Sequence, residues 1–427
     1  MCHRTNRRLC TPWGLALGSL LAIAQVGAPA GGAFAAPKAA TTNDPAPAAT
    51  APELKPGGSF TLEFPDLPED RRGEPAKVQV LLPTRYDPAQ SYGLYVWLGG
   101  GDGGHHANAN VVDRTRFVCA GFPYPKGANN PKQANMVGDF PAIWAYHRPM
   151  LQELLRVVPN IHPRLRIIGG FSNGGHCIDG LLSVPSSDFR RHFGTVLLAD
   201  GGVGVGDYRG LSFAAMFWGE QSPAKRIVPR CAALAKSAGV TLLAEEMPGV
   251  GHAFPREHEQ RAAKWIEQTV VAAVVRADLA SAQAAVRANR SAEAFKLLGG
   301  LRALATAEAD TKKTAELHEK LEAQAQAELT TLIERLEKGK AEAARRAAME
   351  SLASFRLKAA GTAAAGKATE LVSPWVMAQL DALQSDAASK APSRREPAQR
   401  RIRFIAKDWV GTPVGERCAQ MLSGSEP

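Results

Sequence analysis

From residue 58 to about residue 274 the chain alternates between strand-like and helix-like patterns. Two early stretches, 59–64 and 76–82, alternate apolar with polar residues, as antiparallel strands with one solvated face do. Later stretches are short and mostly apolar, and 94–98 is apolar throughout, which is typical of parallel strands buried on both faces. They are 94–98, 116–120, 165–169, 195–199, 212–218 and 240–245. The pattern predicts a sheet that begins antiparallel and becomes parallel.

Helix-like segments separate the later strands. They span 140–157, 175–182, 224–237 and 258–274. Strands that alternate with helices favour a doubly wound sheet, in which helices cover both faces of mostly parallel strands. We therefore predict an α/β domain over residues 58–275.

Beyond residue 275 the strand pattern stops. Residues 276–385 are rich in Ala, Glu, Lys and Leu, and their apolar positions recur at a spacing near that of a helix, which predicts an all-α domain. Residues 386–400 are polar with Pro and Arg, which predicts a linker before a helical tail at 401–427. Within that tail, 404–413 resembles the end of a tetratricopeptide-type helical unit, although no repeat of the tetratricopeptide period is visible.

The predicted strand 165–169 runs into Gly170-Phe171-Ser172-Asn173-Gly174, a Gly-x-Ser-x-Gly pattern. In a nucleophile elbow the serine occupies the tip of a strained turn between a strand and a helix. The two glycines are needed there because a Cβ would collide with the neighbouring strand or helix. The pattern therefore predicts Ser172 as a nucleophile, and the alternative is a tight turn with a solvated serine.

A glycine-rich run, 99–104, follows the predicted strand 94–98. Such a run lets the backbone approach a substrate and direct an N–H group at its carbonyl oxygen. Gly100 and Gly101 are the candidate oxyanion donors, together with the N–H of Asn173. The alternatives are a flexible turn or a metal site. We predict no metal, because the possible ligands lack the spacing that a rigid element would give them: Asp102, His105 and His106.

The candidate base is His252, which lies in the glycine-containing loop 249–255 after the last predicted strand. A serine, then an acid, then a histidine is the chain order of α/β-hydrolase triads. His176 lies four residues after Ser172, and we expect it to be a packed or substrate-side residue rather than the base.

These motifs resemble the esterase D, feruloyl-esterase and polyhydroxybutyrate-depolymerase-like group of α/β-hydrolases. The resemblance covers about 90–260 and rests on the glycine run, the serine motif, the loop at Gly219 and the Gly251-His252 pair. In that group a Gly-x-x-Asp loop follows the strand that ends here near Trp218, yet this sequence has Ser222 at the aspartate position. Two acids remain as candidates. We favour Glu220, in the usual loop, over Asp200, which ends the preceding strand.

Aromatic side chains near the predicted strand ends are candidates for the walls of a substrate site. The long loop 121–138 is rich in Pro, Gly and Asn, and loops at the carboxyl ends of parallel strands line ligand crevices. The candidate wall residues are Phe122, Tyr124, Trp144 and Trp218. An equally weighted alternative is that these aromatics belong to the core.

The N-terminal region has the pattern of a secretory signal peptide, predicted over 1–35. A basic start is followed by a short apolar stretch and the small-residue site Ala33-Phe34-Ala35. Residues 36–57, rich in Ala, Pro and Thr, are predicted to be a disordered leader. We expect an exported protein, periplasmic or extracellular, with no membrane span because no later segment reaches the apolar length of a transmembrane helix.

The charge distribution and the cysteine spacing argue against two further functions, nucleic-acid binding and zinc binding. The formal net charge is +10, but the excess in the helical region forms no basic run with interleaved aromatics. This distribution favours a solvated face over a nucleic-acid surface. Four cysteines follow the predicted signal peptide at wide spacings without a Cys-x-x-Cys pair, so zinc binding is not expected. Cys119 and Cys177 lie in apolar surroundings that are typical of buried thiols.

The resemblance implies an exported serine hydrolase that cleaves a carboxylic ester, small or polymeric, without a cofactor. The helical domain is a possible site for a protein partner. Two other functions stay open at this point. One is a peptidase on the same fold. The other is a non-catalytic binding or scaffold protein, which the missing aspartate at 222 favours and the intact Ser172 and His252 disfavour.

Overall fold

The computed structural model describes residues 52–185, 187–305 and 307–423. The predicted signal peptide and most of the predicted leader lie outside this range.

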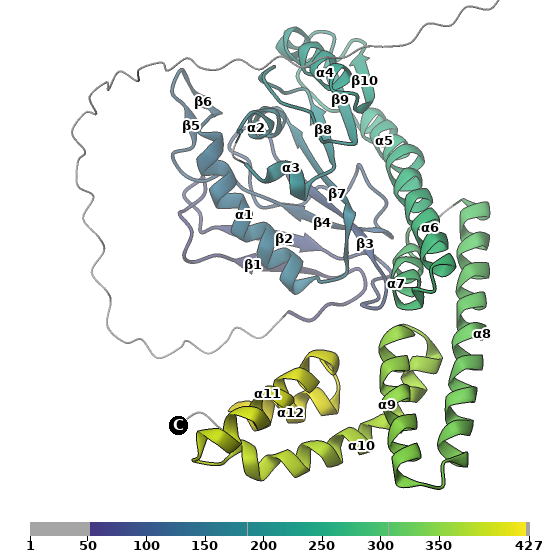
Figure 1. Ribbon diagram of the computed structural model, residues 1–427. Helices are drawn as coiled ribbons and strands as arrows, with labels where there is room; N and C mark the ends of the chain where they lie inside the picture. The colour runs from purple at the N-terminus through teal and green to yellow at the C-terminus, as the bar shows by residue number, and fades with distance from the viewer. Residues whose placement is uncertain (1–51, 186, 306, 424–427) are drawn as a thin grey trace, which may run out of the picture. The chain divides into compact units, whose positions relative to one another are not determined.

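Eight strands of the described residues form one sheet, in the order β1-β2-β4-β3-β7-β8-β9-β10 (Figure 1). Pairing is antiparallel between β1 and β2 and between β2 and β4, and it is parallel throughout the rest. The strands are β1 Ser59–Glu63, β2 Lys77–Leu81, β3 Tyr92–Leu98, β4 Phe117–Gly121, β7 Ile161–Phe171, β8 Thr195–Ala199, β9 Phe213–Gly219 and β10 Thr241–Met247. A separate small hairpin joins β5 Asn129–Asn130 to β6 Gln133–Val137.

Both faces of the sheet are covered, which explains why its inner strands are mostly apolar. In β3, Leu94, Val96 and Leu98 enter the core on one face, while Tyr95 enters the core on the other. The covering helices of this region are α1 Phe140–Val157, α2 Asn173–Leu182, α3 Phe189–His192, η1 Pro223–Arg226, α4 Val228–Ser237 and α5 Arg256–Trp265. The predicted fold class, a doubly wound and mostly parallel sheet followed by an all-α region, is confirmed.

The predicted domain boundary at residue 275 falls inside a continuous helical segment. Helix α5 passes through a π-helical turn, η2 Ile266–Val271, into α6 Ala272–Arg287, and α7 Ser291–Leu301 follows. Buried residues on both sides of the expected boundary, such as Val271 and Leu279, belong to the same core as Tyr95 of the sheet. The boundary is therefore corrected, because the apolar face of these helices is the cover of the sheet.

The same continuous helix, Arg256–Arg287, also corrects the expectation that no later segment approaches the apolar length of a membrane span. By length and composition it is sufficient to cross one, with a mean hydropathy of 1.4 over its most apolar window. Of that window 44% is buried inside the protein, where Val270, Val274 and Leu279 pack in the core beside the sheet. A covered core helix explains this hydropathy.

The C-terminal region is helical, with its own apolar core. Its helices are α8 Glu308–Lys338, α9 Glu342–Lys358, α10 Ala363–Ala387, α11 Pro392–Asp408 and α12 Pro413–Ser423. The predicted linker 386–400 is corrected, because α11 begins at Pro392 and runs through its second half. Proline is favourable in the first turn of a helix, where its missing N–H is not needed. The tetratricopeptide-like resemblance of 404–413 stays a prediction.

The segment between β8 and β9 is held by a buried carboxylate. Asp179 on α2 accepts hydrogen bonds from the backbone N–H groups of Val203 at 2.8 Å, Gly204 at 2.6 Å and Gly206 at 3.1 Å. It also accepts one from the hydroxyl of Tyr208, at 2.7 Å. This anchor fixes the backbone that follows Asp200.

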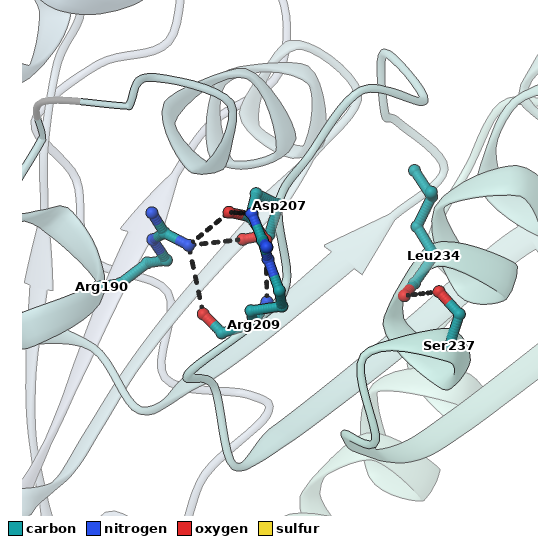
Figure 2. Close-up of polar contacts among 5 residues, drawn as sticks. All are labelled: Arg190, Asp207, Arg209, Leu234 and Ser237. Carbon is teal, nitrogen blue, oxygen red and sulfur yellow. Dashed lines mark hydrogen bonds and ion pairs between the residues drawn. The ribbon is translucent and has the colours of Figure 1, made fainter. Parts of the chain in front are cut away.

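A second cluster ties the same segment to α3 (Figure 2). The Arg190 guanidinium donates to Asp207 at 2.7 Å and to the carbonyl of Arg209 at 3.2 Å, and Arg209 Nε donates to Asp207 at 2.8 Å. These contacts hold the pKa of the Asp207 carboxyl well below its usual range, and the hydrogen bond from Arg209 has the largest effect. Figure 2 also shows the hydroxyl of Ser237 donating to the carbonyl of Leu234 near the end of α4.

A buried histidine on α1 predicts a loss of stability in mild acid. Burial lowers the pKa of His147 to about 4, and its Nε2 lies 2.7 Å from the carbonyl of Pro123. Because the unfolded chain takes up this proton near pH 6.5 and the folded chain does not, the free energy of unfolding falls between about pH 6.5 and 4. At ~1.4 kcal/mol per pKa unit the loss from this residue amounts to about 3 kcal/mol.

We expect His147→Gln to flatten this decline, since glutamine stays neutral and can still donate to Pro123. The measurement is urea unfolding at several pH values between 4 and 8. His106→Gln, at an exposed histidine, is the matched control and should leave the slope unchanged. Parallel slopes in the wild type and His147→Gln would contradict the assignment.

Candidate active site

Ser172 lies at the turn between β7 and α2 with φ 54° and ψ −113°. A non-glycine residue in this region of backbone conformation is strained, and such strain persists only where the surroundings fix it. Here the N–H of Ser172 donates to the carbonyl of Ala199 on β8 at 2.9 Å. The predicted strand, sharp turn and helix are all present.

The glycines around Ser172 are required by close packing. A Cβ added to Gly170 would overlap the backbone of Gly174, and one added to Gly174 would collide with the carbonyl of Leu98 on β3. A Cβ on Gly201, in the neighbouring loop, would collide with the carbonyl of Ser172 itself. The turn is therefore enclosed by backbone, and only glycine fits at these positions.

Three predicted side chains meet at this turn. His252 Nε2 lies 2.8 Å from Ser172 Oγ, and His252 Nδ1 lies 2.5 Å from Asp200 Oδ2. The carboxylate is an acceptor, so Nδ1 carries the proton and Nε2 is free to accept the serine proton. The imidazole stacks on Phe171, with ring centroids 5.0 Å apart. The arrangement can therefore remove a proton from Ser172 and return it to a leaving group.

The carboxylate that contacts His252 is that of Asp200 and not that of Glu220, which corrects the expected placement of Glu220. Glu220 Oε2 accepts instead from the N–H of Gly249, at 2.8 Å, on the exposed side of the loop. Asp200 follows β8 with φ 49°, a left-handed turn that directs its carboxylate toward the imidazole. The side chain of Asp200 is fully buried, whereas that of His252 is 50% exposed.

Ser222, at the position where the resemblance led us to expect an aspartate, supports the carboxylate of Asp200. Its hydroxyl donates to Asp200 Oδ2 at 2.7 Å, and the N–H of Gly219 donates to Asp200 Oδ1 at 2.9 Å. With the bond from His252, the buried carboxylate accepts three hydrogen bonds, which compensate its loss of water. Sequence reasoning missed this role, although a small hydroxyl residue at the aspartate position was the available signal.

The glycine run lies beside the serine, as predicted. A Cβ on Gly100 would lie 3.3 Å from Ser172 Cβ, so the backbone of Gly100 passes close to this serine. Asn173 begins α2, where the first N–H groups have no partner within the helix. Its side chain also donates to the carbonyl of Gly101, at 2.8 Å. The three predicted oxyanion residues are thus neighbours.

The predicted substrate-wall aromatics are mostly core residues, which corrects that prediction. Phe122 and Tyr124 are fully buried in the core, and Trp144 is buried with its indole N–H donating to Asp188 at 2.6 Å. Trp218 is partly buried against the same core. The alternative that these aromatics belong to the core therefore holds for Phe122, Tyr124 and Trp144, because helix α1 and the strands enclose them.

His176 is a packed residue, as expected. Its Nδ1 lies 3.0 Å from the carbonyl of Ser172 and 3.2 Å from the N–H of Gly202. Burial lowers the pKa of this imidazole. Within the described ranges, no group of three His, Cys, Asp or Glu side chains could hold a metal ion, and Cys119, Cys177, Cys231 and Cys418 are buried free thiols.

No protein-family model and no curated protein matches the sequence. Solved structures of esterase 2 from Thermogutta terrifontis are similar to part of the chain. The paraoxon-phosphorylated form has 14% identity and a TM-score of 0.38, covering 51% of this chain and 95% of its own. The propionate-bound form has 15% identity and a TM-score of 0.37, covering 51% and 94%. Similarity at this level carries no argument about activity, so the site is judged on its own geometry.

Proposed function

We propose that this protein is a serine hydrolase that cleaves carboxylic esters through Ser172, His252 and Asp200. The observation that supports the proposal is the continuous set of contacts from Ser172 Oγ through the imidazole to the buried carboxylate. A strained serine at a strand-to-helix turn, with glycine backbone beside it, supports the same chemistry.

In this mechanism Ser172 Oγ attacks the ester carbonyl carbon while His252 Nε2 takes the hydroxyl proton. The carbonyl oxygen becomes an oxyanion that accepts hydrogen bonds from the N–H of Asn173 and from the Gly100–Gly101 backbone. His252 then gives its proton to the departing alkoxide. Water, activated by the same imidazole, releases the acid from Ser172. Asp200 holds the imidazole in the required tautomer and stabilises its charged form.

The non-catalytic alternative loses its main support. It rested on the absence of an aspartate at 222, yet Asp200 supplies a carboxylate to the same imidazole. No contact in the described residues favours a peptidase over an esterase, so ester cleavage is the function that we propose. Export also stays part of the proposal, and N-terminal sequencing of the purified protein would contradict it by finding Met1 retained.

The test of the proposed function is labelling with a fluorophosphonate, in which Ser172 Oγ displaces fluoride from phosphorus. We expect one label per chain, located on the peptide that contains Ser172 by mass spectrometry. Labelling should compete with a short-chain nitrophenyl ester, and hydrolysis of that ester should be measurable. A folded protein that takes no label and cleaves no ester would refute the proposal.

A further inference from the structure

The glycine loop beside Ser172 is held through its carbonyl groups. The hydroxyl of Tyr124 donates to the carbonyl of Gly99 at 2.6 Å, and Asn173 Nδ2 donates to that of Gly101 at 2.8 Å. The guanidinium of Arg72 donates to the carbonyl of Gly103. Alternate carbonyls are therefore each fixed by a different side chain.

The bond from Tyr124 has a direct geometric consequence for the next N–H. The peptide unit is planar and trans, so the carbonyl of Gly99 and the N–H of Gly100 lie in one plane and point in opposite directions. Fixing this carbonyl onto the buried phenol therefore fixes the N–H of Gly100 on the side away from the phenol. Gly100 is also the glycine of this loop whose added Cβ would lie near Ser172 Cβ.

A loop made of glycines does not hold such an orientation by itself. Rotating the peptide between Gly99 and Gly100 changes one backbone angle on each residue, and glycine tolerates nearly all values of both. Without a partner for the carbonyl, the N–H would turn away from the site at little steric cost. The phenol is the group that opposes this rotation, and Tyr124 is fully buried.

We propose that Tyr124 is a positioning residue, which holds the N–H of Gly100 in place to donate to the oxyanion that forms on Ser172. This inference rests on the proposed function and replaces the predicted role of Tyr124 as a substrate wall. Burial also raises the pKa of the Tyr124 phenol well above its usual value. The hydroxyl therefore stays a donor over the whole working pH range, and its contribution should not depend on pH.

The test is Tyr124→Phe, which removes only the hydroxyl. Loss of a whole oxyanion donor costs about 10²–10³ in kcat, and a donor that is present but misoriented costs less, so we expect kcat to fall by about 10- to 100-fold. KM should change by less than about threefold, because the oxyanion exists only in the transition state. The affinity for an alkyl boronic acid, which forms a tetrahedral adduct with serine, should fall by a factor similar to that of kcat.

Rates are expressed per site titrated with the fluorophosphonate, so a partly folded preparation does not imitate the effect. The matched control is Tyr86→Phe, which removes another buried phenol hydroxyl, bonded to Asn160 at 2.9 Å and outside the site. It should leave kcat and boronate affinity unchanged.

An unchanged kcat in Tyr124→Phe would overturn the inference while leaving the proposed function intact. A raised KM with unchanged kcat would also overturn the inference, because the hydroxyl would then act on substrate binding and not on the oxyanion. A pH-dependent loss would also contradict it, since the phenol does not titrate in this range. If the wild-type protein neither takes the label nor turns over ester, the proposed function fails, and the inference fails with it.

Discussion

Replacing Ser172 with alanine is expected to reduce the turnover of short-chain nitrophenyl esters by about 10⁴- to 10⁶-fold. The alanine keeps the Cβ but removes the oxygen that would form the acyl intermediate, so His252 has no proton to accept. Serine and alanine carry the same penalty at φ 54°, so the turn and the stability of the fold should be unaffected. The measurement is initial-rate kinetics together with thermal unfolding of both proteins.

Ser183→Ala is the matched control for this variant. Ser183 follows α2 and its hydroxyl donates to the carbonyl of Gly180 at 2.6 Å, so it makes a local bond and no contact with the imidazole. Its loss should leave the rate within a few-fold of the wild type. Equal rates for Ser172→Ala and the wild type would remove Ser172 from the mechanism.

Asp200→Asn should lower kcat by up to about 10⁴-fold, the second-largest effect that we expect. Asp200 Oδ2 accepts from His252 Nδ1 and from the hydroxyl of Ser222. An amide can present an NH₂ group to the ring, which favours the tautomer whose proton lies on Nε2. That tautomer cannot accept the proton of Ser172. The amide is also neutral, so it lacks the negative charge that stabilises the imidazolium.

Glu220→Gln is the isosteric control, because it makes the same carboxylate-to-amide change in the adjacent loop. Glu220 contacts the N–H of Gly249 and not the imidazole, so its amide should cost less than about tenfold. Kinetics of both variants over pH 5–9 provide the comparison. A large loss in Glu220→Gln with little loss in Asp200→Asn would show that the exposed carboxylate is the working acid.

The strands and the serine turn could be predicted because their determinants are local. The run 195–199 is apolar at every position after Thr195 because both faces of the sheet are covered, and β8 has these same bounds. The glycines at 170 and 174 had to accompany Ser172 because backbone atoms of neighbouring elements lie where a Cβ would be. Such requirements appear directly in the residues that satisfy them.

The carboxylate that contacts His252 could not be chosen from the sequence, because its position depends on a backbone angle and on the spacing of neighbouring strands. Asp200 and Glu220 both follow apolar strands, and the two strands are neighbours in the sheet. The left-handed turn at Asp200 decides which carboxylate reaches His252. A pattern of residue types does not reveal that turn. The hydrogen bond from Ser222 is likewise visible only in three dimensions.

The boundary at 275 was placed at a change of composition, and the fold ignores that change. The strands end there, but the sheet still needs a cover, and Leu279, Phe295 and Leu298 supply it from the residues beyond. The aromatics Phe122 and Trp144 were also ambiguous, since a core and a crevice wall favour the same residue types.

The uninterrupted helix from Arg256 to Arg287 limits how this protein could be assembled from exchangeable modules. Recombination at residue 275 would separate the sheet from the apolar residues that cover it, and the junction would lie within a helix. A junction after Leu304 would retain nearly all of that cover, leaving only Leu321 of the buried cluster on the other side. The heritable unit that carries Ser172, Asp200 and His252 therefore includes α6 and α7, so these two helices would be inherited together with the three side chains.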